Sequence, residues 1–226
     1  ALWRREVVRV LLDYDGTLHD CRKIYAPAFR KAYRTLVELG VRAPKNWRDQ
    51  ELERWLGVSP KAMWAEFAPD LPEVLREECS QIIFQEMLRR TERGEAALYP
   101  GVPALLERLK GEGYSLLLLS NCQRLYLEVH RRQFSLDRYF DGVYCTEDYG
   151  WPAKWELFPA IRRDLPGEYL VVGDRASDLE IARRYGLPSV GCAYGYGAPG
   201  ELEGSSAQIQ SPEQLPRALT RLGLTP

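Results

Sequence analysis

Residues 7–17 read Val-Val-Arg-Val-Leu-Leu-Asp-Tyr-Asp-Gly-Thr and join a run of mostly apolar residues to a short acidic segment. An apolar run of this length predicts a buried strand. Asp13 and Asp15 are two positions apart, so in an extended backbone both carboxylates point to the same side. Gly16 permits a sharp turn, and Thr17 offers a hydroxyl group and a backbone N–H. The stretch therefore predicts a buried strand that ends in a polar, acidic turn.

Three other apolar runs have the length of strands. They are Tyr114–Leu119, Tyr169–Val172 and Ser189–Ala193. The first two, like the run before Asp13, are followed by residues with helical periodicity. Continuous apolar strands separated by helices are typical of a parallel sheet that is covered on both faces. The sequence thus predicts an α/β fold with a doubly wound, Rossmann-like core.

The residues from 21 to 98 break this alternation. They contain no convincing strand, and residues 24–40 fit an amphipathic helix that ends at Gly40, with further helical patterns behind it. Asp20 is expected to be the N-cap of that first helix. The pattern predicts an all-helical subdomain inserted after the first strand.

The core resumes at the turn Tyr99-Pro100-Gly101, and residues 102–110 fit a helix behind it. The stretch 195–206 is rich in Gly, Ala and Ser and is expected to be a loop. We therefore expect an α/β core made of residues 1–20 and 99–226, with the helical insert at residues 21–98.

The composition argues against several classes of protein. The formal net charge of −1 gives no sign of a surface for nucleic acid. The longest apolar run, Tyr114–Leu119, is far too short to cross a bilayer, and no segment has the pattern of a signal peptide. The five cysteines show no CxxC spacing, so neither a zinc site nor a disulfide framework is indicated. We expect a cytoplasmic protein, monomeric or homodimeric, that binds neither nucleic acid nor membranes.

Polar segments follow three of the predicted strands. They are residues 13–17, Ser120-Asn121 and residues 173–178, and Lys154 lies between the last two. Ligands of an open parallel sheet bind outside the carboxyl ends of its strands. If the fold is as predicted, these separate segments meet in one pocket.

The residue types in these segments suit the hydrolysis of phosphate esters. Of Asp13 and Asp15, one carboxylate can attack phosphorus while the other protonates the leaving oxygen and later accepts a proton from water. Asp174 and Asp13 offer hard oxygen ligands to Mg²⁺, which helps an anionic nucleophile to approach an anionic phosphate. Lys154 supplies a positive charge. Ser120 is expected where a helix begins, so that its hydroxyl group and free N–H groups can hold a phosphate oxygen.

Each of these residues also has a purely structural interpretation. An aspartate after a strand, such as Asp174 or Asp178, is often a helix N-cap or a turn residue. Ser120-Asn121 by itself is more often a cap than a phosphate site, and a lone lysine such as Lys154 is usually a solvated surface group. Cys122 as an alternative nucleophile has no partner in the sequence. The occurrence of all the segments together, in this order, favours phosphate chemistry.

In these segments the chain resembles the haloacid-dehalogenase superfamily, and more closely its phosphoglycolate-phosphatase-like branch. Residues 13–18 are similar to the first motif, with Tyr14 where Phe, Leu or Met is commoner. Ser120-Asn121 is similar to the second motif, Lys154 to the third, and Gly173-Asp174 with Asp178 to the fourth. The third motif departs from the family pattern, because a proline usually follows the lysine, whereas here Trp155 follows it and Pro152 precedes it.

The resemblance implies roles for these residues. Asp13 would be the nucleophile and Asp15 the general acid and base. Mg²⁺ would be held by Asp13, the backbone carbonyl of Asp15, Asp174 and, directly or through water, Asp178. The transferring phosphate would be bound by Thr17, Ser120, Asn121 and Lys154. The insert would be a cap domain that closes over a small phosphorylated metabolite. Lys61 lies in a segment similar to the cap loop of sugar-phosphate mutases and is a candidate for contact with that substrate, although a lysine at the start of a helix is more often a surface group.

The function predicted in this way is that of a Mg²⁺-dependent phosphatase acting through an aspartyl-phosphate on Asp13. Dehalogenases and phosphonatases share the fold but lack an aspartate at the position of Asp15. A sugar phosphomutase keeps both aspartates and carries Arg where Pro60 stands here. A catalytically inactive regulatory or binding protein of this fold would be expected to lose the nucleophile or a metal ligand, and both are present. The mutase and the inactive protein stay open as alternatives.

Overall fold

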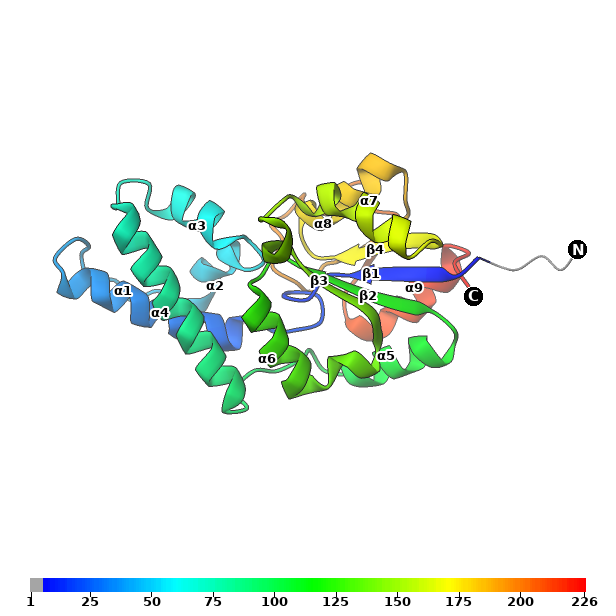
Figure 1. Cartoon of the computed structure of the whole chain (residues 1–226), viewed down its shortest axis with the longest axis horizontal. Coiled ribbons are helices and arrows are strands. Elements are labelled where there is room, and N and C mark those ends of the chain that lie inside the picture. The colour runs from blue at the N-terminus through cyan, green and yellow to red at the C-terminus, as the bar shows by residue number, and fades with distance from the viewer. Residues whose placement is uncertain (1–5) are drawn as a thin grey trace, which may run out of the picture.

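Six parallel strands form the centre of the protein, as seen in a computed structural model that describes residues 6–226 (Figure 1). The strands are β1 (Val8–Leu12), β2 (Ser115–Ser120), β3 (Phe140–Cys145), β4 (Glu168–Gly173), β5 (Ser189–Cys192) and β6 (Ala207–Ile209). Their order in the sheet is β3-β2-β1-β4-β5-β6. This is a doubly wound order, which reverses direction between β1 and β4. The predicted fold class is confirmed.

Two strands, β3 and β6, have no counterpart among the predicted apolar runs. They form the two edges of the sheet. An edge strand pairs on one side only and need not be buried on both faces. β3 accordingly mixes an exposed Asp141 with half-buried residues, and β6 is only three residues long. Neither leaves a continuous apolar run in the sequence.

Alternate side chains of the central strands fill separate cores on the two faces of the sheet. Val10 and Leu118 belong to the larger cluster, which includes side chains of α5, α6 and α9. Leu11 and Leu117 belong to a second cluster with α7 and α8. The helices are α5 (Val102–Gly111), α6 (Arg124–Phe134), α7 (Lys154–Asp164), α8 (Ala176–Tyr185) and α9 (Leu215–Arg221). Figure 1 shows α7 and α8 on one side of the sheet and α5, α6 and α9 on the other. Because these strands are buried on both faces, they appear in the sequence as mostly apolar runs.

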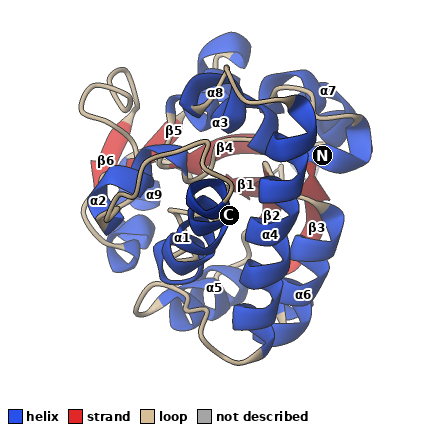
Figure 2. Ribbon diagram, turned by 90° about the vertical axis from the view of Figure 1, so that its left-hand side faces the viewer, coloured by secondary structure: helices blue, strands red, loops and turns tan. Residues whose placement is uncertain are grey.

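Four helices follow β1 before the chain returns to the sheet, and we call them the cap helices. They are α1 (Arg22–Glu38), α2 (Asp49–Leu52), α3 (Pro60–Phe67) and α4 (Glu73–Glu92). In α1 the predicted amphipathic helix is confirmed, with Gly40 in the left-handed conformation just beyond its end. The cap helices lie beyond the carboxyl ends of the strands, and Figure 2 looks onto them with the sheet behind. Within residues 6–226, none of the helices has both the length and the apolar character of a membrane span.

The two crossings between core and cap lie side by side. The N–H of Asp20 donates to the carbonyl of Ala97, and the N–H of Tyr99 donates to the carbonyl of Leu18. We propose that the domain division follows these crossings, with the cap at residues 21–98 as expected from the sequence. The predicted N-cap is wrong, however, because Cys21 holds that position without a capping side chain. Asp20 instead accepts a hydrogen bond from the hydroxyl group of Tyr196 at 2.6 Å.

Candidate active site

Asp13 lies directly after β1 and is paired with Lys154, the first residue of α7. The Nζ atom of Lys154 lies 2.7 Å from Oδ1 of Asp13 and 2.6 Å from Oδ1 of Asp178. Glu156 accepts a hydrogen bond from the N–H of Ala153, which closes the first turn of α7 and sets the position of Lys154. The lysine is only 4% exposed. A solvated surface role for Lys154 is therefore excluded, although Pro152 stands before it rather than after it.

Asp174 follows β4, the neighbour of β1 at the point where the strand order reverses. It is completely buried, and its Oδ2 accepts a hydrogen bond of 2.8 Å from the N–H of Tyr196. The hydroxyl group of Thr17 lies 3.4 Å from Oδ1 of Asp174 and 3.5 Å from Oδ2 of Asp13. Gly16 has a φ of +88° and no side chain, which allows its backbone to lie close to the carboxylate of Asp174. A Cβ atom at this position would lie 2.1 Å from that carboxylate.

Three carboxylates, those of Asp13, Asp174 and Asp178, can each offer an oxygen atom within 4.8 Å of the others. Burial, and then the nearby Asp178, raise the pKa of Asp13 to about 6, against the opposing effect of Lys154. Burial and the charge of Asp13 also raise the pKa of Asp174. Burial by itself lowers the pKa of Lys154, but Asp13 and Asp178 together raise it by more than burial lowers it. The pKa therefore lies above its ordinary value, and the lysine is charged. One ammonium group among three buried carboxylates leaves an excess of negative charge, and these hard oxygen donors fit a divalent cation such as Mg²⁺.

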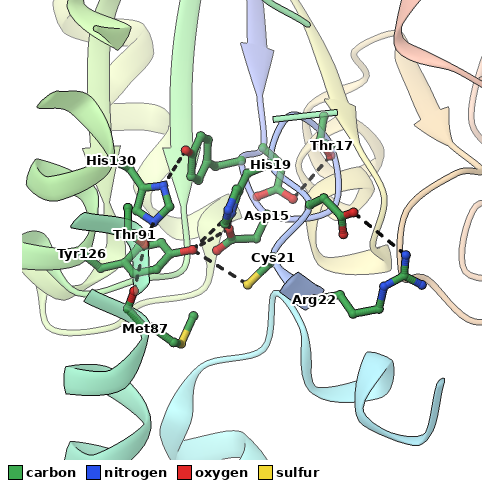
Figure 3. A network of polar contacts seen from close by, with 12 residues as sticks. Asp15, Thr17, His19, Cys21, Arg22, Met87, Thr91, Tyr126 and His130 are labelled. Carbon is green, nitrogen blue, oxygen red and sulfur yellow. Dashed lines mark hydrogen bonds and ion pairs between the residues drawn. The ribbon is translucent and has the colours of Figure 1, made fainter. Parts of the chain in front are cut away.

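The carboxylate of Asp15 has a different set of partners. Its Oδ1 accepts a hydrogen bond of 2.8 Å from the hydroxyl group of Tyr126, on α6, and lies 2.7 Å from Nδ1 of His19 (Figure 3). Because Oδ1 accepts from the hydroxyl group of Tyr126, we assign it as the acceptor from His19 as well, so that His19 donates through Nδ1 and Oδ2 is left to carry a proton. The backbone from Tyr14 to His19 forms a tight turn in which the carbonyl of Tyr14 accepts three N–H groups. The alternation of side chains in an extended strand does not apply to this turn, so the partners of Asp15 could not be predicted from it.

A second chain of hydrogen bonds starts at Tyr14, which stands between the two aspartates in the sequence, and continues through His130 and Thr91, which are labelled in Figure 3. The hydroxyl group of Tyr14 lies 2.7 Å from Nδ1 of His130 on α6, and Nε2 of that ring lies 3.4 Å from the hydroxyl group of Thr91 on α4. Burial, with a smaller contribution from His19, lowers the pKa of His130, so the ring is neutral. Thr91 donates to the carbonyl of Met87, which leaves its oxygen to accept from Nε2. Tyr14 is then the donor to Nδ1, and the chain of bonds joins the acidic turn to a cap helix.

His19, His130 and Tyr126 were not predicted as site residues. The available signal was that the chain has only two histidines, one of them directly after the first motif and the other four residues after Tyr126 on one helix.

Ser120 and Asn121 lie at the carboxyl end of β2, next to β1 in the sheet. The expectation that Ser120 stands where a helix begins is wrong, because α6 starts at Arg124 with Gln123 as its N-cap. Cys122 is buried, and burial raises the pKa of its thiol well above the usual value. A protonated thiol is a poor nucleophile, so this alternative to Asp13 loses support.

Two cavities meet at Asn121. One, the central cavity, has Asp15 in its wall and extends between α6 and the cap helices. The other is lined by Lys154, Arg175 and part of the cap segment 57–62. Arg175 directly follows the Gly173-Asp174 pair of the fourth motif but was not predicted as a site residue. Its guanidinium group donates to the carbonyl of Leu56 at 2.8 Å and so holds the cap loop. The structure therefore brings most of the predicted segments to one edge of the sheet.

Lys61 is the exception among the predicted site residues. It is exposed near the start of α3 and lines neither of these two cavities. It borders a separate hollow together with Glu147 and Trp151. Its exposure fits the surface alternative, and a contact of Lys61 with a substrate stays a prediction. From the same segment, Gly57, Val58 and Pro60 line the central cavity.

Comparisons with known proteins agree with this geometry. A family described as haloacid dehalogenase-like hydrolase matches residues 10–192. A 5'-nucleotidase from Pseudomonas aeruginosa is 30% identical over 197 residues, which cover 85% of this chain and 86% of the relative. A phosphoglycolate phosphatase from Aquifex aeolicus is 27% identical over 192 residues, which cover 83% of this chain and 85% of the relative.

Solved structures show the same fold. A predicted phosphatase from Clostridium acetobutylicum superposes with a TM-score of 0.80 at 21% identity and covers 96% of this chain and 100% of its own. The protein CbbY from Rhodobacter sphaeroides, in complex with phosphate, superposes with a TM-score of 0.73 at 19% identity and covers 92% of this chain and 95% of its own. At these identities the likeness concerns the fold alone.

Proposed function

Because the chain belongs to the haloacid dehalogenase-like hydrolase family, we propose that it is a Mg²⁺-dependent phosphatase that hydrolyses a small phosphate monoester through an aspartyl-phosphate on Asp13. One observation carries the proposal. Asp13 is buried at the point where the strand order reverses, 2.7 Å from a charged lysine and beside two further carboxylates. Relatives that are named as phosphatases and as a nucleotidase support the same reaction class.

The chemistry divides between the two aspartates of the first motif. A carboxylate oxygen of Asp13 forms a bond to phosphorus while the bond from phosphorus to the leaving oxygen breaks, and Asp15 gives a proton to that oxygen. Asp15 then takes a proton from a water molecule, whose oxygen attacks phosphorus and releases Asp13. The hydrogen bonds from Tyr126 and His19 hold the carboxylate of Asp15 at the wall of the central cavity.

The phosphoryl group needs partners of the opposite sign around Asp13. Lys154 neutralises both the nucleophile and the phosphoryl oxygens, and Thr17, Ser120 and Asn121 offer hydrogen bonds to those oxygens. Asp13, the carbonyl of Asp15, Asp174 and Asp178 (directly or through water) would hold Mg²⁺. The ion would reduce the repulsion between carboxylate and phosphate. A mutase function draws no support from Lys61, which is exposed and lines neither of the two cavities.

The test is phosphate release from an aryl phosphate by the parent protein and by Asp13→Asn, each with Mg²⁺ and with EDTA. We expect turnover only in the parent protein with Mg²⁺. Asp164→Asn is the matched control, because Asp164 is exposed at the end of α7 and its carboxylate pairs only with its neighbour Arg163 among the contacts described. Turnover by Asp13→Asn at the parent rate would show that the nucleophile lies elsewhere.

A further inference from the structure

The central cavity is lined mainly by apolar and aromatic side chains of the cap. Tyr25, Trp55, Met63, Trp64 and Phe84 contribute to its wall, and Asp15 lies on the core side. The centre of a water-sized sphere can occupy about 80 Å³ between these walls, and a single water molecule needs only about 10–15 Å³ of such space. The cavity therefore has room for several water molecules, or for a leaving group larger than two carbon atoms.

The leaving group of a substrate belongs in this cavity, a step that rests on the proposed function. Asp15 must reach the leaving oxygen in order to protonate it. Asp15 lines the central cavity, whereas Lys154 and Arg175 line the cavity on the other side of Asn121. A phosphoryl group held between Asp13 and Lys154 therefore places its ester oxygen towards Asp15 and the rest of the substrate among the cap residues.

The charge of the cavity restricts what that leaving group can be. Among the described residues that line it there is no Lys, Arg or His, and Asp15 is the one residue with an acidic side chain. A leaving group with a carboxylate or a second phosphate would lose water and find no cation, which is costly for a buried charge. Phosphoglycolate, the substrate named for several relatives, carries such a carboxylate. This cavity fits it poorly.

Two polar atoms in the aromatic wall lack partners. The hydroxyl group of Tyr25 and Nε1 of Trp64 are both buried, and neither has a hydrogen-bond partner within the part of the chain that the structure describes. A buried polar group without a partner is costly, and a bound ligand or water molecule is one way in which such a group gains a partner. The indole N–H can only donate, and the tyrosine hydroxyl can donate or accept. A ligand with hydrogen-bond acceptors on a flat apolar body would satisfy both atoms.

We infer that the preferred substrates are phosphate monoesters whose leaving group carries an uncharged aromatic ring with hydrogen-bond acceptors, of the kind found in nucleosides. Trp55, Trp64 and Phe84 provide flat apolar surfaces for such a ring. Tyr25 and Trp64 select among rings through their free hydroxyl and N–H groups. Selectivity comes from the cap, while the phosphoryl group is held by the core.

The experiment compares kcat/KM for three esters: adenosine 5'-monophosphate, ribose 5-phosphate, which lacks the ring, and phosphoglycolate, which has a carboxylate in its place. We expect the ring to raise kcat/KM at least tenfold over ribose 5-phosphate, with phosphoglycolate the poorest of the three. Trp64→Ala should lower the ratio between the first two esters by roughly tenfold or more, since stacking and a hydrogen bond are both lost.

Tyr25→Phe removes only the hydroxyl group, and Trp64→Phe replaces the indole by a smaller aromatic ring that has no N–H. Each should lower the same ratio by roughly two- to tenfold. Trp47→Phe is the matched control, because it also removes a buried indole N–H without a partner, at a place outside the cavity. It should leave the ratio unchanged. The inference is overturned if phosphoglycolate is the preferred ester. It is also overturned if Trp64→Ala, Trp64→Phe and Tyr25→Phe all leave the ratio of kcat/KM between adenosine 5'-monophosphate and ribose 5-phosphate unaltered. Either result leaves the phosphatase function intact. If the parent protein hydrolyses none of the esters faster than Asp13→Asn does, the proposed function itself fails.

Discussion

Replacement of Lys154 by methionine removes the charge at the centre of the site and keeps a side chain of similar length. Its ammonium group donates two charge-assisted hydrogen bonds, of 2.7 Å to Asp13 and 2.6 Å to Asp178, among side chains that are at most 6% exposed. The loss of one partner of a buried ion pair costs about 3–5 kcal/mol. The free energy of unfolding should fall by this amount in EDTA, where no metal ion replaces the lost charge.

The result is visible in thermal unfolding and in kinetics. For a chain of this size, about 3–5 kcal/mol corresponds to a decrease in Tm of roughly 6–20 °C. A lone lysine is usually a solvated surface group whose replacement changes the stability little, and the burial of Lys154 at the start of α7 reverses that expectation. With Mg²⁺ present the difference in Tm between variant and parent should narrow. The lost contact to an ionised group should also lower kcat/KM by roughly ten- to a hundredfold.

Lys110→Met provides the comparison, since this exposed lysine donates only to the backbone carbonyl of Arg138 among the contacts described. Its Tm and kcat/KM should stay within error of the parent values. If Lys154→Met behaves like Lys110→Met in both assays, the buried ion pair has no energetic role and the account of the phosphate site is refuted.

Three further outcomes follow from the geometry. Asp15→Asn should slow the hydrolysis of alkyl phosphates far more than that of p-nitrophenyl phosphate, whose leaving group needs no proton; equal losses would remove Asp15 as the acid. Tyr126→Phe deletes the 2.8 Å hydrogen bond to Asp15 and should lower kcat/KM for alkyl phosphates by roughly three- to tenfold, with a smaller change for the nitrophenyl ester. The pKa of Asp13 is about 6 in the folded, metal-free protein and 3.8 ordinarily, so between these values the folded state holds a proton that the unfolded chain has released. The free energy of unfolding in EDTA should therefore fall by up to about 3 kcal/mol as the pH rises from about 4 to 6, relative to Asp13→Asn, and level off above pH 6, as urea titrations can measure.

The sequence was sufficient for the central strands, the cap helices and the family. Strands β1, β2 and β4 are largely buried on both faces, so each appears in the sequence as a mostly apolar run that can be recognised without knowing its partners. The acidic turn after β1 is likewise local, since its aspartates, glycine and threonine are neighbours in the chain. The carboxyl ends of parallel strands meet at one edge of a sheet, and this rule alone brings Asp13 and Asp174 together.

The partners of individual side chains were decided only by the tertiary structure. Asp20 reads as a helix cap but pairs with Tyr196, 176 positions away, and Asp15 is held by Tyr126, 111 positions away. Such pairings depend on the packing of α6 and of the loop after β5 against the acidic turn, for which the sequence has no periodic signal. The edge strands β3 and β6 were missed because partial exposure removes the apolar pattern. The central cavity, too, has walls from cap and core that are brought together only by folding, and no spacing along the chain specifies them.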